Sequence, residues 1–313
     1  MPSIRTLPVC EPVRRFSLGP WQAELLPRQP YEASYTPHAF VIGFAFEGQQ
    51  GTHAFATDRV QAFRTKPNSL AFVPPDCDVF SRSSTGGEYL RLTAPGLFLQ
   101  EKWAQRPFND AIDSIALAAA RDLRRFLLRD SPGEPLFFEQ RIQILVDRAR
   151  RFLDGGARDG RADGWMTPRR LKRIDDLIEA SLDQGLTVAD LSRTLELSEG
   201  FFSRAFKAAI GTSPYDYILD RRISRARSLL RQGPDDLSAV AFASGFASHA
   251  HMTAVFRSRL GLTPSALRDG SNAQIEKNRV SVTDPASASF ETPPAGAPQD
   301  ECNSLAKNKF SSS

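Results

Sequence analysis

One pattern of residues occurs twice in the C-terminal half of this 313-residue chain, with a spacing of 50 positions. The matched positions are Ser198 with Ser248, Phe206-Lys207 with Phe256-Arg257, Gly211 with Gly261, and Ser213-Pro214 with Thr263-Pro264. An internal repeat indicates that the chain builds one structural unit more than once. We therefore expect two similar units within residues 167–268.

Each copy has the signals of two helices joined by a tight turn. In the first copy, Thr187 is expected to cap a short helix through Thr194, and Ser198 a second helix to about Ile210. Glycine is common just past the last turn of a helix, and Gly211 and Gly261 stand at those places. The second copy predicts a helix near 238–243, a turn at 244–246 that contains Gly245, and a helix over 249–260. This is a helix-turn-helix pattern, present twice.

Two longer helices are predicted around the first copy. One begins at Thr167-Pro168 and continues to about Leu182. The other spans 214–231, between the copies, and stops at Gly233-Pro234. Its 18 residues would extend about 27 Å, which helps to separate two helices toward the ~34 Å between successive major grooves on one side of a duplex.

The charge of the repeat region is positive. Residues 197–268 contain ten Lys or Arg and five Asp or Glu, a balance of +5, whereas the whole chain has a net charge of +4. A basic helical region can be an ordinary solvated surface. Two helix-turn-helix copies in register, joined by a helix of suitable length, favour DNA binding instead.

The repeat resembles the double helix-turn-helix module of the AraC/XylS-type transcription regulators. In the first copy the matching residues lie within 191–218, and in the second within 240–264. The resemblance covers about 100 of the 313 residues. It implies a transcription regulator that binds double-stranded DNA and contacts RNA polymerase. Activation is the commoner mode in that family, so the resemblance favours an activator.

The resemblance also implies which side chains face the DNA. The positions that would read bases are Ser203, Arg204, His249 and Thr253; those of close approach are Gly200, Ala250 and Ala254; those near phosphates are Lys207 and Arg257. An arginine such as Arg204 can form a bidentate contact to guanine. A basic residue is common in the family where Ala254 stands, and Ala250 replaces a residue that is usually polar. The second unit is therefore expected to read sequence weakly.

The N-terminal region has a different character. Residues 1–100 hold short apolar stretches, such as 40–46 and 69–73, and an alternating segment at 88–93, all of which predict strands of a small barrel or sandwich. Helices are predicted over 109–129 and 134–154, as a hairpin. An apolar stripe in the second helix either packs within the domain or pairs two subunits into a homodimer. Its residues are Phe138, Ile142, Leu145, Ala149 and Phe152.

These segments define four parts of the chain. Residues 1–154 would form a ligand-sensing or dimerisation domain, 155–166 a flexible glycine-rich linker, 167–268 the DNA-binding domain and 269–313 a disordered tail. The same order is found in larger members of the resembled family, whose first domain is similar to a cupin barrel. The predicted fold class is α+β: an N-terminal cupin-like β-barrel with a helical hairpin, followed by an all-α double helix-turn-helix domain.

Other classes of protein are disfavoured. The scattered Cys10, Cys77 and Cys302 and the four histidines give no disulfide framework or metal-ligand spacing, so we expect no metal, cofactor or catalytic residue. No apolar run reaches the ~18 residues that cross a bilayer, and a secretory signal is absent, which favours the cytoplasm and no membrane partner.

The role of the first domain stays open at this point. Seven aromatic residues of the N-terminal region either line a pocket for a small-molecule effector or form core: Trp21, Phe40, Phe44, Phe46, Phe55, Phe72 and Tyr89. The effector-binding residues are unknown. The alternatives are a cupin-type small-molecule enzyme, and a DNA-binding protein whose first domain only recruits protein partners.

Overall fold

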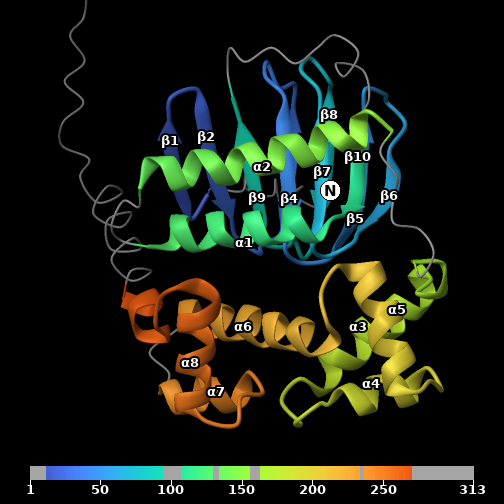
Figure 1. Ribbon diagram of the computed structural model, residues 1–313, viewed down its shortest axis with the longest axis vertical. Coiled ribbons are helices and arrows are strands. Elements are labelled where there is room, and N and C mark those ends of the chain that lie inside the picture. The colour runs from blue at the N-terminus through green and yellow to red at the C-terminus, as the bar shows by residue number, and fades with distance from the viewer. Residues whose placement is uncertain (1–11, 95–106, 130–133, 156–162, 233–235, 270–313) are drawn as a thin grey trace, which may run out of the picture. The chain divides into compact units, whose positions relative to one another are not determined.

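The computed structural model describes residues 12–94, 107–129, 134–155, 163–232 and 236–269. Strands occupy the described residues up to Ile112, and helices follow (Figure 1). The α+β class predicted from the sequence is confirmed. A domain division at 155–166 stays a prediction, and the expected tail from 270 onward lies outside the described residues.

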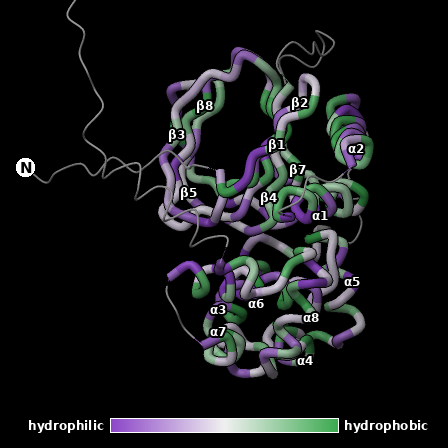
Figure 2. The backbone as a smooth tube through the Cα atoms, turned by 90° about the vertical axis from the view of Figure 1, so that its left-hand side faces the viewer, coloured by the Kyte–Doolittle hydropathy of each residue, from purple (hydrophilic) through white to green (hydrophobic). Residues whose placement is uncertain are grey.

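Two antiparallel sheets form the N-terminal part. The larger contains, in spatial order, β1 (Arg14–Leu18), β2 (Trp21–Leu26), β9 (Tyr89–Thr93), β4 (Val41–Ala45), β7 (Ser69–Val73) and β10 (Phe108–Ile112). The smaller contains β3 (Tyr31–Tyr35), β8 (Val79–Ser83), β5 (Gln49–Phe55) and β6 (Gln61–Thr65). Figure 2 shows β3, β8 and β5 on the side opposite β1, β4 and β7. This is the cupin-like barrel that the resemblance implied.

Alternation along the strands separates the two faces of the larger sheet. In β9, Leu90 and Leu92 are buried in the main hydrophobic core, whereas Tyr89 and Arg91 line the space between the sheets. The period of two in a strand sends neighbouring side chains to opposite faces. Strands β4 and β7 follow the same rule, and every residue of both is buried because both of their faces are covered.

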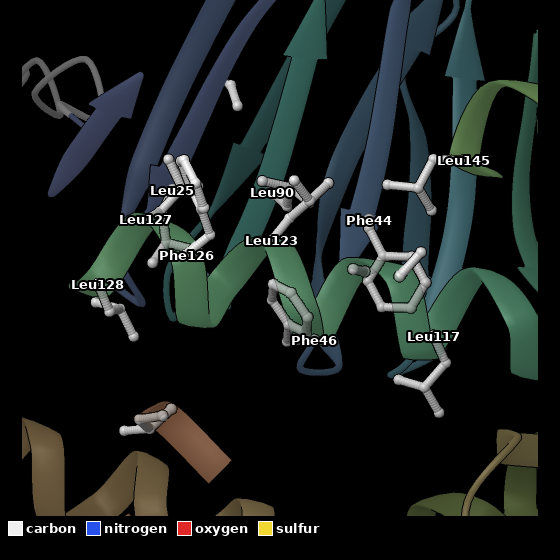
Figure 3. Packing of buried hydrophobic residues seen from close by; sticks show 14 of the residues in the cluster. Leu25, Phe44, Phe46, Leu90, Leu117, Leu123, Phe126, Leu127, Leu128 and Leu145 are labelled. Atoms are coloured by element: carbon white, nitrogen blue, oxygen red, sulfur yellow. The ribbon is translucent and has the colours of Figure 1, made fainter. Parts of the chain in front are cut away.

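Helices α1 (Ser114–Leu128) and α2 (Pro135–Leu153) cover the outer face of the larger sheet (Figure 1). Leu123 of α1 lies near Leu90 of the sheet, and both side chains are fully buried (Figure 3). Burial of one such side chain contributes about 1.5–3 kcal/mol. The apolar stripe on α2 belongs to this core, since Phe138, Ile142 and Leu145 have no exposed surface. The stripe was expected either to pack within the domain or to pair two subunits, and the structure supports packing within the domain.

The first helix of the hairpin begins later than predicted. Residues 109–112 belong to strand β10, which pairs antiparallel with β7 and places Ala111 opposite Leu70. Asp113 then caps α1, because its Oδ1 accepts hydrogen bonds from the backbone N–H groups of Ile115 and Ala116 at 2.9 and 2.8 Å. The helical prediction from 109 was wrong because pairing at the sheet edge outweighs local helical pattern in this segment.

Six helices make up the C-terminal part of the described chain: α3 (Pro168–Ser181), α4 (Val188–Thr194), α5 (Glu199–Ile210), α6 (Pro214–Gln232), α7 (Leu237–Ala243) and α8 (His249–Leu260). A short 3₁₀ helix, η2 (Asp163–Trp165), precedes them, and Met166 is buried against α3 and its neighbours. The end of the predicted linker is thus structured. Residues 156–162 lie outside the described residues.

None of the described helices combines the length and the apolar character that would be needed to traverse a bilayer.

Candidate functional site

The two helix-turn-helix units match in length and in capping. The first helices, α4 and α7, have 7 residues each, and the second helices, α5 and α8, have 12 residues each. Ser198 accepts a hydrogen bond from the Phe201 N–H, and Ser248 accepts the corresponding bond from the His251 N–H. The predicted helix-turn-helix repeat is therefore present in the structure.

The turns of the two units differ by one residue. Leu195 to Leu197 separate α4 from the cap of α5, whereas Ser244 to Ala247 separate α7 from the cap of α8. Each turn contains one residue with positive φ, which is Glu196 at 57° in the first unit and Gly245 at 82° in the second.

Helix α5 presents one polar face and one buried face. Gly200, Arg204 and Lys207 are exposed and Ser203 is half-buried, whereas Phe202 and Phe206 on the other side are fully buried. Positions separated by three and four residues share one side of a helix. The side chains predicted to meet DNA thus lie together along one side of α5.

Arg204 and Gly200 are neighbours on this face. A side chain added at Gly200 would lie 3.6 Å from a terminal nitrogen of Arg204, so the guanidinium group extends along the glycine toward the start of the helix. Neither Arg204 nor Lys207 forms an ion pair within the described part of the chain. Both cations are therefore available to an external anion or a base edge.

Helix α8 presents an equivalent face, on which alanine stands at the position of Arg204. His249, Ala250, Ala254 and Arg257 are exposed, at the same spacing as the residues on α5. Thr253 is half-buried, and its hydroxyl oxygen is buried without a hydrogen-bond partner among the described residues. A base contact from Thr253 would therefore require rotation of its side chain.

Half of the ten cations of residues 197–268 are buried or form ion pairs within the protein. Arg222 and Arg227 are buried, and Arg227 pairs with Glu88. Three further cations form ion pairs: Arg221 with Glu179, Arg259 with Asp216, and Arg268 with Asp269. The charge count from the sequence therefore overstates the positive charge that is exposed. Arg204, Lys207 and Arg257 remain exposed on the two second helices.

A cavity of about 310 Å³ lies between the two sheets of the N-terminal part. Of the seven aromatic residues named from the sequence, Phe55 and Tyr89 line it, whereas Phe40, Phe44 and Phe72 are buried in the core instead. The sequence reasoning missed other lining residues, among them Tyr31, His53 and Phe63. Strand alternation identifies them in retrospect, because each lies two residues from another lining position.

A buried ionic cluster lies beside this cavity. Gly87 and Tyr89 line the cavity, and Glu88 between them is 3% exposed. One carboxylate oxygen of Glu88 accepts a hydrogen bond from Arg124 of α1 at 3.0 Å, and the other accepts one from Arg227 of α6. Burial opposes ionisation of Glu88, but the two guanidinium groups outweigh it and hold the pKa of Glu88 below its ordinary value. The carboxylate therefore links the cavity wall to the helix between the two helix-turn-helix units.

The described part of the chain contains no group of three or more His, Cys, Asp or Glu side chains placed to hold a metal ion.

Comparison with known proteins gives a consistent assignment for the helical repeat. A family model described as a helix-turn-helix domain matches residues 191–270. The HTH-type transcriptional regulator YidL of Escherichia coli (strain K12) is 37% identical over 109 residues, which are 34% of this chain and 36% of YidL. The HTH-type transcriptional activator RhaS of Escherichia fergusonii is 28% identical over 185 residues, 58% of this chain and 64% of RhaS.

A part of the chain is also similar to solved structures. A transcriptional regulator of Chromobacterium violaceum, described as containing an AraC-type DNA-binding domain, is 30% identical; the match covers 33% of this chain and 92% of that one, with a TM-score of 0.31. The chain spans about a third to two thirds of the length of the curated relatives named above. Together, the observed repeat and the family match identify residues 191–270 as a helix-turn-helix domain.

Proposed function

We propose that the protein is a sequence-specific DNA-binding transcription regulator in which both helix-turn-helix units contact one duplex. The observation that carries the proposal is the matched pair of exposed faces on α5 and α8. Positions 200, 204 and 207 on one helix and 250, 254 and 257 on the other are all exposed. A second helix of a helix-turn-helix unit enters the major groove with such a face.

The exposed residues of α5 and α8 are assigned different roles in DNA binding. Arg204 reads guanine through its guanidinium group, and Ser203 and His249 supply adaptable hydrogen bonds to bases. Thr253 joins them after its hydroxyl turns outward. Lys207 and Arg257 neutralise phosphates, and Gly200, Ala250 and Ala254 allow close approach. Most of the sequence preference therefore comes from α5.

The arrangement along the chain fits two adjacent major grooves. Helix α6 connects the units and has 19 residues, a length of about 28 Å. Successive grooves on one side of a duplex are ~34 Å apart. One chain can thus supply both reading helices, and the proposal does not require a dimer for DNA binding.

The cavity is assigned to a small-molecule effector. It is enclosed by both sheets, and its wall is joined through Glu88 to Arg227 of α6. A ligand that moves the segment around Glu88 would change the position of α6, and thereby the DNA affinity. This requires that the ligand binds the protein more tightly with α6 in one position than in the other. Contact with RNA polymerase and an activating role are proposed on the family resemblance and on the name of the relative RhaS.

Selection from a random pool tests this function. Purified full-length protein is incubated with randomised duplex DNA, and the bound molecules are sequenced over several rounds. We expect one enriched motif with two elements, the stronger of which loses its preference at one base pair in an Arg204→Ala protein. Binding without any enriched motif, at every salt concentration that permits binding, would contradict sequence-specific recognition.

A further inference from the structure

The wall of the N-terminal cavity is built from side chains of both sheets. Small residues on the larger sheet, Ala45, Ser69 and Ala71, face the cavity and leave it open. The volume of about 310 Å³ is at the lower end of the range of ~300–1,000 Å³ that is usual for small-molecule sites. A ligand of one or two fused rings is therefore of suitable size.

Aromatic rings form much of the remaining wall. Tyr31, Tyr35, Phe55, Phe63 and Tyr89 line the cavity together with the imidazole of His53. The rings of His53 and Phe63 are stacked, with centroids 4.8 Å apart and planes 8° from parallel. A planar ring bound between the sheets would meet further ring faces and edges, which are favourable partners for an aromatic ligand.

Tyr89 owes its place to a glycine on the neighbouring strand. A side-chain carbon added at Gly43 would lie 1.6 Å from the Tyr89 hydroxyl oxygen, so the phenol occupies the space above Gly43. Enclosure by the protein raises the pKa of Tyr89, and it also raises that of Tyr35. Both phenols therefore stay neutral near pH 7 and can donate or accept a hydrogen bond.

The charges at the wall already have partners. Arg91 Nε donates to Glu24 Oε2 at 2.7 Å, and Glu24 also accepts from Arg15 Nε at 2.7 Å. The carboxylate of Asp110 accepts a hydrogen bond from the Lys66 N–H at 2.8 Å. Burial lowers the pKa of His53 below its ordinary value, although Asp110 opposes this shift, so the imidazole is neutral near pH 7.

A charged ligand would bind weakly in this cavity. An anion would have to compete with Glu24 for Arg91, and the carboxylate of Asp110 already accepts the bond from the Lys66 N–H. An ion of either sign would also give up its hydration shell on entering the cavity, which is costly. An uncharged ligand avoids both penalties.

We propose that this cavity binds an uncharged aromatic small molecule that carries a hydroxyl or carbonyl group. The aromatic rings of the wall select a planar ring system, and the neutral phenol of Tyr89 forms a hydrogen bond with the polar group. This inference rests on the effector site assigned under the proposed function, and it adds the chemical class of the effector.

Three probes test the class on the full-length protein by isothermal titration calorimetry at pH 7. They are 2-naphthol, which is uncharged and aromatic; 2-naphthoate, which is aromatic and anionic; and 1-decanol, which is uncharged and aliphatic. We expect 2-naphthol to bind at least about tenfold more tightly than either of the others, a difference of ~1.4 kcal/mol. Equal or tighter binding of 2-naphthoate or 1-decanol, or no binding of 2-naphthol, would overturn the proposal.

Three variants test whether 2-naphthol binds in the cavity. Ala71→Phe fills the cavity from β7 and should abolish 2-naphthol binding, whereas the same change at the exposed Ala62 of β6 should leave it intact. Tyr89→Phe should weaken 2-naphthol but not naphthalene, which lacks the hydroxyl. Unaltered 2-naphthol binding in Ala71→Phe would show that 2-naphthol binds outside this cavity.

The same proteins separate this inference from the proposed function. DNA selection with the Ala71→Phe protein should still enrich a motif, because the cavity lies in the β-sheet part of the chain. Enrichment of a motif with the wild-type protein but failure of all probes would contradict the ligand class alone. Binding of 2-naphthol without an enriched motif would instead contradict the regulator function.

Discussion

Glu88 accepts a hydrogen bond from Arg227, a residue 139 positions further along the chain, and both side chains are at least nine-tenths buried. Arg124 completes the cluster with a bond of 3.0 Å to the other carboxylate oxygen. Removing the charge of one member leaves the others buried without compensation. We expect Glu88→Gln to lower the free energy of unfolding by about 3–5 kcal/mol, as measured by urea denaturation of the full-length protein.

A surface ion pair gives the control for this substitution. Glu32 and Arg82 lie 3.5 Å apart, and 37% and 57% of their side-chain surfaces are exposed. Exposed pairs contribute little, so Glu32→Gln should change the free energy of unfolding by less than ~1 kcal/mol. Equal effects of the two substitutions would show that the buried cluster does not hold α6 in place.

The same cluster predicts how stability depends on pH. The pKa of Glu88 is lower in the folded protein than its ordinary value, so the unfolded chain binds more protons as the solution becomes acidic. The contribution of Glu88 is complete above the ordinary glutamate pKa of ~4.3 and is lost as pH falls below it. Urea titrations from pH 7 to pH 3 should show a smaller acid loss in Glu88→Gln than in the wild type. Parallel curves for the two proteins would argue against this assignment.

The turn of the second unit should be sensitive to any side chain at Gly245. A side-chain carbon there would lie 1.8 Å from the Leu182 carbonyl oxygen, at the end of α3, and the φ of 82° is unfavourable for alanine. Gly261 has a similar φ of 76°, but a carbon added there would meet its nearest neighbour at 3.6 Å. Both alanine variants should lose about 1–2 kcal/mol from the left-handed backbone.

The overlap with Leu182 should cost Gly245→Ala a further ~1–3 kcal/mol. Thermal or urea unfolding of the two variants measures this difference. If Gly261→Ala is as destabilised as Gly245→Ala, the close approach between the turn and α3 is not a packing constraint.

Arg204 and Lys207 share a face of α5 but should differ in their effect on DNA binding. Arg204→Ala should weaken the best site by about 1–3 kcal/mol and relax the preference at one base pair. Lys207→Ala should weaken all duplexes alike and reduce the salt slope by about one. Fluorescence anisotropy with matched and mismatched duplexes over a salt series distinguishes the two.

Arg257→Ala provides the equivalent test in the second unit, because Arg257 stands where Lys207 stands in the first. It should behave as Lys207→Ala does. An Arg204→Ala protein with unchanged base preference would remove Arg204 from the base-reading role.

Local signals were sufficient to predict most of the helical part from the sequence. Ser198 and Ser248 cap their helices as expected, and Gly211 and Gly261 end them with φ of 78° and 76°. These signals act within a few residues of each other, so one sequence is enough to recognise them. The strand over 69–73 was also predicted at its observed bounds.

Contacts between distant segments were beyond such reasoning. The pairing of β10 with β7 turned a predicted helical start into a strand, and Arg227, one of the cations counted in the positive segment, is buried and bonded to Glu88. The inward hydroxyl of Thr253 likewise depends on packing. The roles assigned to Ser203, Arg204, His249 and the other DNA-facing residues stay predictions.

The central claim is that α5 and α8 of one chain read two successive major grooves. The most direct test measures the affinity of the full-length protein for its selected duplex and for the same duplex with five base pairs inserted between the two elements. Five base pairs are about half of the 10–10.5 that make a helical turn, so the insertion turns the second element to the opposite side of the DNA. We predict at least a roughly tenfold loss of affinity, to the level of a duplex that retains only the first element. Equal affinity for the two duplexes would contradict simultaneous reading of both grooves by one chain.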